Sequence, residues 1–259
     1  LGSWKRKYDG EYYTYEELAP ILISYLQEHH FTHVEFMPIM EHPLDASWGY
    51  QITGFYAATS RYGTPEQLKL LIDELHNNNI GVILDWAPSH FCKNEEGLRL
   101  FDGLPLYEST ESWKSENYGW GTTNFNFSSL EVRSFLIANA LYWIKEFHVD
   151  GLRVDAVSNI LYLDYGKKQG EWKANEYGTN VDLAAVLFLK ELANAIEQLE
   201  IPAILIAEES TTWPGITSHV VDGGLGFQYK WNMGWMHDTL DYISTAPSER
   251  NRIHHNLTF

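Results

Sequence analysis

Short apolar runs that each end in polar residues are the clearest pattern along this chain. Four of them stand out, at Phe31–Ile39, Gly81–Pro88, Val149–Val157 and Ala203–Ser210. Their length, β-branched content and nearly continuous apolarity are typical of strands that are buried on both faces. The pattern therefore predicts four strands of a parallel sheet.

Segments with the 3.6-residue periodicity of amphipathic helices lie between these runs. Thr14–Glu17 forms a capping box ahead of the first helix, and Thr64–Gln67 does so for the second, with Pro65 at the first helical position. A third helix opens at residues 128–131, and a fourth runs from about Val181 to Leu199. The alternation of helices and strands predicts an α/β fold, whereas the residues after about 210 give no clear pattern.

The positions of the polar residues favour a (β/α)₈ barrel over an open doubly wound sheet. No glycine-rich phosphate loop follows any of the four runs, so a dinucleotide-binding sheet has no support. Asp85, Arg153, Asp155 and Glu208 lie at predicted carboxyl ends of strands, where barrel enzymes gather their catalytic groups. One such residue could simply terminate a strand, but carboxylates at three strand ends favour a site. The length of 259 residues fits one barrel domain or two small ones.

Two connections are longer than a plain loop. Residues 91–127 follow the second apolar run and contain several aromatic residues, among them Trp113, Tyr118 and Trp120. Residues 159–180 form a second, polar insertion that also carries aromatic side chains, among them Tyr165. Connections beyond about 15 residues are usually functional, so we expect the 91–127 segment to be a functional excursion from the barrel.

Composition and charge narrow the classes of partner. The formal net charge is −17, which disfavours nucleic acid and anionic membrane surfaces. Aromatic residues make up 15% of the chain, which suits either a bulky core or surfaces that stack against sugar rings. The single cysteine, Cys92, cannot form an intramolecular disulfide and favours a reducing, cytoplasmic location. Because the chain begins at Leu1 rather than Met, we expect it to be a fragment or processed piece.

Arg153 and Asp155 are the first pair with candidate chemistry. They are two residues apart in a predicted strand, so both side chains point to the same face. A guanidinium beside a carboxylate lowers the carboxylate's pKa and keeps it ionised, as a nucleophile requires. A structural ion pair near a strand end explains the same pattern about equally well.

Glu208 and Glu209 are adjacent at the end of another strand, so only one of them can face the barrel mouth. The flanking residues are apolar on both faces, and periodicity therefore does not choose between them. A glutamic acid beside apolar walls has a raised pKa and can donate a proton near neutral pH. Paired with an ionised aspartate on a neighbouring strand, it matches a retaining glycosidase, which works through a covalent glycosyl intermediate.

Sugar-binding groups are expected at two further strand ends. Asp85 and His90 lie at the rim of one strand and could bond sugar hydroxyls, although a lone histidine is more often structural. Tyr50, in the segment Ser47–Gln51, offers an aromatic face in a loop after a strand. That segment reads equally well as a turn filled by core aromatics. The pairs His29–His30 and His254–His255 lack convergent ligands, so no metal site is predicted.

The order DWAPSH (85–90), GLRVDAV (151–157) and AEES (207–210) resembles the first three signature regions of the α-amylase superfamily of glycoside hydrolases. Longer segments are similar to the bacterial 1,4-α-glucan (glycogen) branching enzymes. These are SWGYQITGFYA (47–57), NALYWIKEFHVDGLRVDAV (139–157), GEWKANEYG (170–178), AEESTTWPG (207–215) and GLGFQYKWNMGWMHDTLDY (224–242). The resemblance extends over essentially the whole chain.

The resemblance implies a role for each matching position. Asp155 matches the catalytic nucleophile, and Glu208, the first acid of AEES, matches the general acid/base. Arg153 matches the residue that orients the nucleophile. Two further matches concern the sugar: Asp85 with His90 for its hydroxyls, and Tyr50 for stacking at the cleaved glucose; the family requires no cofactor.

Two departures from the superfamily pattern are present. Ser89 stands where the superfamily usually has asparagine, and the fourth signature, a His-Asp dipeptide, is missing. His237-Asp238 lies in a different family segment and is not that dipeptide. The resemblance therefore implies a partial (β/α)₈ barrel, about strands 2–6, within one incomplete catalytic domain at 1–259.

The implied activity is transfer of an α-1,4-glucan chain to an α-1,6 linkage by a retaining double displacement. The expected partner is α-1,4-glucan, such as glycogen or amylose. An α-glucan hydrolase of the same superfamily is the nearest alternative, and a non-catalytic glucan- or partner-binding barrel is an alternative from another class.

Overall fold

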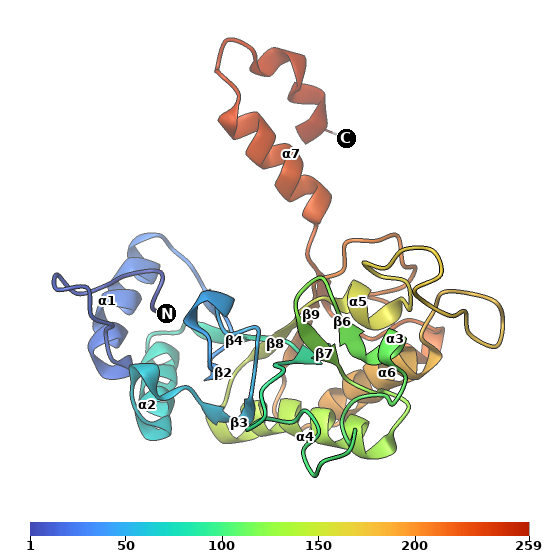
Figure 1. Ribbon diagram of the computed structural model, residues 1–259. Coiled ribbons are helices and arrows are strands. Elements are labelled where there is room, and N and C mark those ends of the chain that lie inside the picture. The colour runs from blue at the N-terminus through green and yellow to red at the C-terminus, as the bar shows by residue number, and fades with distance from the viewer. Residues whose placement is uncertain (259) are drawn as a thin grey trace.

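Five parallel strands form the central sheet of this computed structural model, which describes residues 1–258 (Figure 1). They are β1 (His33–Phe36), β4 (Gly81–Trp86), β8 (Gly151–Val154), β9 (Ile204–Ala207) and β10 (Tyr229–Lys230), hydrogen-bonded in that order. The first four lie within the four predicted apolar runs. The fifth lies after residue 210, in the part of the chain for which no element was predicted.

Four long helices pack side by side on the outer face of the sheet; one precedes the first strand and the other three connect successive strands (Figure 1). They are α1 (Tyr15–Glu28), α2 (Pro65–Asn77), α4 (Leu130–Phe147) and α6 (Leu183–Glu197). Both predicted capping boxes are confirmed: Thr14 and Glu17 cap α1 reciprocally, and Thr64 and Gln67 cap α2. The fourth helix begins at Leu183 rather than near Val181, because the Asp182 carboxylate accepts the amides of the first turn.

The sheet is a sector of a barrel. Each strand pairs in parallel with the next one along the central sheet, with a helix-containing crossover between most of them. Within residues 1–258, β1 and β10 form the two edges and do not pair with each other. The prediction of a partial barrel of about five strands is therefore confirmed, and its mouth lies open on one side.

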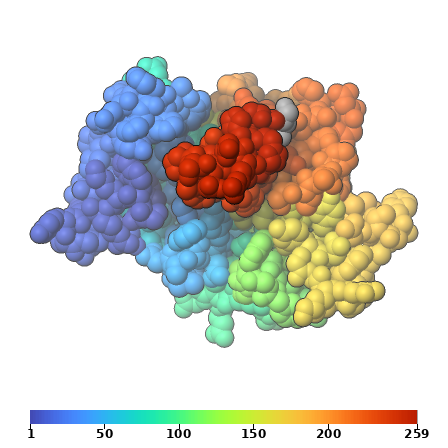
Figure 2. Space-filling model, turned by 90° about the horizontal axis from the view of Figure 1, so that it is seen from above, coloured from blue at the N-terminus to red at the C-terminus, as the bar shows by residue number. Residues whose placement is uncertain are grey.

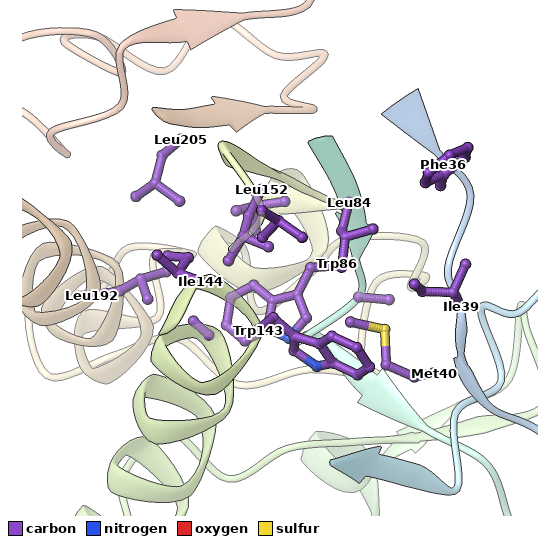
Figure 3. Close-up of a cluster of buried hydrophobic side chains, with 14 of the residues drawn as sticks. Phe36, Ile39, Met40, Leu84, Trp86, Trp143, Ile144, Leu152, Leu192 and Leu205 are labelled. Atoms are coloured by element: carbon purple, nitrogen blue, oxygen red, sulfur yellow. The ribbon is translucent and has the colours of Figure 1, made fainter. Parts of the chain in front are cut away.

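The core fills the space between the sheet and the helices (Figure 3). Trp86 of β4 and Trp143 of α4 are fully buried there, and their polar nitrogens need partners. Trp86 Nε1 donates to Asn139 Oδ1 at 2.8 Å, while Trp143 Nε1 donates to the carbonyl oxygen of Phe55 at 3.0 Å. Asn139 Nδ2 donates to that same oxygen at 2.7 Å. This network fixes α4 against β3 (Gly54–Ala58) as well as against the central sheet.

Small antiparallel sheets lie in the connections. β2 (Met40–Glu41) pairs with β3, and the 91–127 excursion contributes β6 (Glu116–Asn117) and β7 (Thr122–Asn124), which join β5 (His90–Phe91) in the order β5-β7-β6. The excursion also contains the short helix α3 (Ser112–Ser115).

The C-terminal segment projects away from the sheet and consists of α7 (Met233–Ser244) followed by 3₁₀ turns at Arg250–Arg252 and His254–Leu257 (Figure 1). Figure 2 shows this segment in red above the remainder of the molecule. None of the side chains of α7 is buried. Among the helices of residues 1–258, none combines the length and apolarity needed to cross a membrane.

Candidate active site

Strand register brings the candidate residues to one edge of the sheet. Asp85 of β4 pairs with Arg153 of β8, and Val154 pairs with Ala207 of β9. Beyond these strands, the amide of Asp155 donates to the carbonyl of Trp86, and the amide of Glu208 donates to the carbonyl of Val154. The backbone thus places three acids from three neighbouring strand ends in the same layer, as barrel enzymes do.

Arg153 is the centre of this cluster and is 3% exposed. Its Nη1 lies 2.6 Å from Asp85 Oδ1 and 2.8 Å from Asp155 Oδ1. Its Nη2 lies 2.9 Å from Glu208 Oε2. One guanidinium therefore binds all three carboxylates, which is more than the single ion pair that the strand alone indicated. The indole ring of Trp231, just after β10, covers the guanidinium at 4.3 Å.

Burial dominates the electrostatics of Asp155, whose side chain is 13% exposed. Burial raises its pKa to about 8, and the charges of Asp85 and Glu208 act in the same direction, while Arg153 opposes them. The sequence-based expectation of a lowered pKa is therefore wrong in its net direction. Three carboxylates share one cation here, so the repulsion from Asp85 and Glu208 adds to burial at Asp155 and outweighs the attraction of Arg153.

Tyr50 and His90 lie beside this cluster. The Tyr50 hydroxyl donates to Asp85 Oδ2 at 2.5 Å, and its half-buried ring packs against the core, whereas stacking on a sugar stays a prediction. Burial raises the pKa of Tyr50, which keeps the hydroxyl protonated. His90 is 3% exposed, and burial lowers its pKa to about 4, so its imidazole is neutral near pH 7.

The structure separates the roles of the two adjacent glutamates. Glu208 faces a cavity, whereas Glu209 is fully buried on the other side of the strand end. Glu209 accepts bonds from Ser158 Oγ at 3.1 Å, the Thr211 amide at 2.8 Å and Lys230 Nζ at 2.7 Å. Burial alone would raise the pKa of Glu209, but these donors outweigh it and hold the pKa below its usual range.

The cavity at the barrel mouth has a volume of about 370 Å³ and is lined by both Asp155 and Glu208. Tyr50 and His90 also line it. Asp85 and Arg153 lie beneath this layer, where they contact Tyr50 and Asp155. Six candidate residues from the sequence therefore form one contiguous site: Tyr50, Asp85, His90, Arg153, Asp155 and Glu208.

Other residues at the site were not predicted from the sequence. Trp120 from the 91–127 excursion and Tyr165 from the 159–180 insertion both line the cavity. The aromatic content of these two connections was a signal, but it could not identify which rings reach the site. Glu35 of β1 lies near Asp85, and desolvation together with the Asp85 charge raises its pKa to about 7. The only sign of Glu35 in the sequence was that a charged residue interrupts the apolar run Phe31–Ile39.

Two further observations concern candidate residues outside this cluster. Across residues 1–258, no group of three or more His, Cys, Asp or Glu side chains could hold a metal ion. His237 and Asp238 lie on α7, in the segment that projects from the sheet, and neither lines the cavity (Figure 1).

Comparisons with known proteins agree with this geometry. A family profile described as "Alpha amylase, catalytic domain" matches residues 22–101. The chain is 61% identical over its whole length to "1,4-alpha-glucan branching enzyme GlgB 2" of Clostridium perfringens strain 13, covering 39% of that protein. It is 58% identical over 257 residues to "1,4-alpha-glucan branching enzyme GlgB" of Francisella tularensis subsp. novicida, covering 40% of it. The chain thus spans about two fifths of the length of these relatives.

Solved structures show the same fold. An α-amylase from Geobacillus thermoleovorans complexed with acarbose matches 87% of the chain and 46% of its own, with a TM-score of 0.65 and 21% identity. A putative α-amylase from Salmonella typhimurium matches 92% of the chain and 37% of its own, with a TM-score of 0.67 and 26% identity. The sequence resemblance and the barrel fold that it implies are both confirmed.

Proposed function

This chain resembles the bacterial 1,4-α-glucan branching enzymes along all of its own length. We therefore propose that the protein containing this chain forms α-1,6 branches in α-glucan. The observation that carries the proposal is the pair Asp155 and Glu208, which come from neighbouring strand ends, line one cavity and are linked by Arg153. Residues 1–259 would form part of the catalytic barrel, with 91–127 as an excursion. The single Cys92 and the acidic net charge favour cytoplasmic action on a neutral glucan over nucleic acid or membrane.

The first step of the proposed reaction forms a glycosyl-enzyme. An oxygen of Asp155 attacks the anomeric carbon of an α-1,4-linked glucose, and the bond to the leaving oxygen breaks. Glu208 donates its proton to that oxygen, so the departing chain keeps a free 4-hydroxyl. The reaction therefore requires Asp155 in its ionised form and Glu208 in its acid form when glucan is bound. Arg153, 2.8 Å from Asp155, orients the attacking oxygen and stabilises its charge.

The second step transfers the chain. The 6-hydroxyl of an acceptor glucan attacks the anomeric carbon and displaces Asp155, while the Glu208 carboxylate takes up the hydroxyl proton. Each step inverts the anomeric carbon, so the two steps together retain its configuration. The site thereby returns to its starting protonation state.

Positions around the acids suit a neutral sugar. The Tyr50 ring borders the cavity and offers a stacking face at the cleaved glucose. His90 is neutral near pH 7, so it can exchange hydrogen bonds with hydroxyls without adding charge. Asp85 is bonded to Tyr50 and Arg153 and does not line the cavity, so in the proposed site it orients these two side chains from beneath.

A paired assay on the full-length protein tests this proposal against hydrolysis. Branching of amylose lowers its absorbance with iodine without a matching rise in reducing ends, whereas hydrolysis produces reducing ends with each cleavage. We expect the first result, and we expect Glu208→Gln to abolish it. The exposed residue Glu200 offers a matched control, Glu200→Gln, which should leave the rate unchanged. Reducing ends that rise with every cleavage would assign a hydrolase, and no reaction at all would leave a binding barrel.

A further inference from the structure

The inner face of the central sheet, on the side away from the helices, carries an acid for which the proposed reaction has no role. One set of residues paired across four strands points into the core and is buried there (Figure 3): Phe36, Leu84, Leu152 and Leu205. Side chains alternate along a strand, so the residues one position earlier point to the inner face. These are likewise paired with one another, and they form one layer: Glu35, Ile83, Gly151 and Ile204.

Glu35 is the charged member of this layer. The other members are apolar or, at Gly151, have no side chain, so no side chain of the layer can donate a hydrogen bond to the Glu35 carboxyl. The next layer on the same face begins two residues further along the strands, and it contains Asp85 of β4 and Arg153 of β8. Glu35 therefore lies one layer beneath the cluster in which Arg153 binds three carboxylates.

Access to solvent distinguishes Glu35 from the groups above it. Part of its side chain reaches solvent, whereas Asp85 is 1% exposed and Arg153 is 3% exposed. Partial burial and the charge of Asp85 raise the pKa of Glu35 to about 7, and the attraction of Arg153 opposes them. Glu35 can therefore exchange its proton with the solution and change its charge near neutral pH.

The same face of β1, β4 and β8 presents three other groups that titrate or carry charge. They are His33, Asp85 and Arg153. Asp85 disfavours the ionisation of Glu35, and because such an interaction is reciprocal, an ionised Glu35 disfavours the ionisation of Asp85. Glu35 also attracts the guanidinium of Arg153. An ionised Glu35 thus adds a fourth negative charge around one cation, so it should make the ionisation of Asp155 less favourable.

We propose that Glu35 is a positioning residue for the proposed reaction: its charge, acting through Arg153 and the carboxylates bound there, sets the pH above which Asp155 can serve as the nucleophile. The inference rests on the proposed function, because it takes Asp155 to be the nucleophile. Glu35 does not line the cavity at the barrel mouth, so it acts without touching the glucan. An ionised Glu35 disfavours the ionisation of Asp155, and removal of its charge should therefore let Asp155 ionise at a lower pH.

The pH profile of the full-length protein on amylose provides the first test. Glu35→Gln removes the charge and keeps the shape of the side chain, so the acidic limb of kcat/KM should move to lower pH by about 0.5 unit. Glu35→Asp keeps the charge and should retain most of the parental profile. Glu28→Gln is the matched control, since it removes an exposed charge at the end of α1 and should leave the limb in place. An unmoved limb in Glu35→Gln, or an equal shift in Glu28→Gln, would overturn the proposal.

Melting temperatures at pH 8 test the same coupling without turnover. The gain in melting temperature from Asp155→Asn should be smaller in a Glu35→Gln background than in the parent, because one of the charges that repel Asp155 is already gone. A gain of equal size in both backgrounds would show that the two carboxyls do not interact, and it would overturn the proposal. The result is separable from the branching assay: coupled melting temperatures in a protein without branching activity would support the electrostatic link and refute the proposed reaction.

Discussion

Two acids that are adjacent in sequence, Glu208 and Glu209, occupy opposite electrostatic environments. Glu209 is fully buried and accepts bonds from a lysine, a serine and a threonine, so its negative charge is well compensated. Glu208 shares one guanidinium with Asp85 and Asp155, so that side of the strand end carries more negative charge than its partners neutralise. The hydrogen bonds and ion pair of Glu209 stabilise the fold, whereas burial and the neighbouring carboxylates raise the pKa of Asp155 on the other side. Two adjacent residues of the same type therefore have a structural role on one side of the strand end and a proposed chemical role on the other.

The largest expected effect is on the branching rate, and it follows from substituting Asp155 in the cluster of three carboxylates around Arg153. Asp155→Asn in the full-length protein should reduce branching by about 10⁴-fold or more, because it removes the nucleophile. The melting temperature should not fall, since the variant also removes a carboxyl whose ionised form is disfavoured by burial and by two neighbouring carboxylates. Iodine–amylose absorbance and thermal melting measure the two quantities. Branching near the parental rate would show that Asp155 is not the nucleophile.

Substituting Glu209, whose carboxylate is fully hydrogen-bonded, should instead lower the free energy of unfolding. Glu209→Ala leaves Lys230, Ser158 and Thr211 without their shared acceptor, and we expect the free energy of unfolding to drop by about 3 kcal/mol. Glu208→Ala, one residue earlier, should change it by less than about 1 kcal/mol because its carboxyl is already in excess. Denaturant unfolding of both variants provides the comparison. Equal losses in stability would mean that the two acids are not distinguished in this way.

Stability as a function of pH should distinguish the two sides as well. The folded pKa of Asp155 is raised to about 8, above its unfolded value of about 3.9, so the folded state keeps a proton that the unfolded state releases. Its contribution therefore becomes more destabilising as the pH rises between these values. The lowered pKa of Glu209 acts in the opposite direction, and its stabilisation is lost as the pH falls through that pKa.

The gain in melting temperature of Asp155→Asn over the parent should accordingly grow from about pH 5 to about pH 8. Glu209→Gln should show its smallest deficit at the acidic end of the range. Melting curves at a series of pH values measure both trends. A gain for Asp155→Asn that shrinks with rising pH would contradict the raised pKa.

The smallest expected effect concerns the ring that covers Arg153. Trp231→Leu removes a cation–π contact at 4.3 Å but leaves the ion pairs of the guanidinium intact. A contact of this kind contributes about 1 kcal/mol, so the branching kcat should fall about fivefold with little change in KM. Trp231→Phe should recover part of the loss. A change confined to KM would indicate that Trp231 contacts the glucan rather than positioning Arg153.

Local patterns were sufficient for much of the fold. The strands β4, β8 and β9 and the caps of α1 and α2 follow from apolar runs and from side chains that bond nearby backbone amides. The edge strand β10 has only two residues, Tyr229 and Lys230, and no apolar run marks it. Its pairing depends on β9 already being in place, which no local pattern records.

Sequence patterns predicted that the acids and Arg153 gather at one edge of the sheet, but they did not predict the balance of charge there. A period of two placed Arg153 and Asp155 on one face, yet the net pKa shift of Asp155 depends on burial and on carboxylates from two other strands. The choice between Glu208 and Glu209 likewise required the family resemblance or the structure. Trp120 and Tyr165 reach the cavity through long connections, and their positions depend on tertiary contacts alone.

The carbonyl oxygen of Phe55 has a consequence for the order of folding during synthesis. It accepts bonds from Asn139 and Trp143, which lie 84 and 88 residues further along the chain. A ribosome adds about 5–20 residues per second, so the two donors are synthesised about 4–18 seconds after Phe55. Until α4 has left the ribosome, burial of β3 would leave that oxygen without a hydrogen-bond donor. The early part of the nascent chain therefore has reason to stay loosely packed, and the arrival of one helix sets the moment at which it can close.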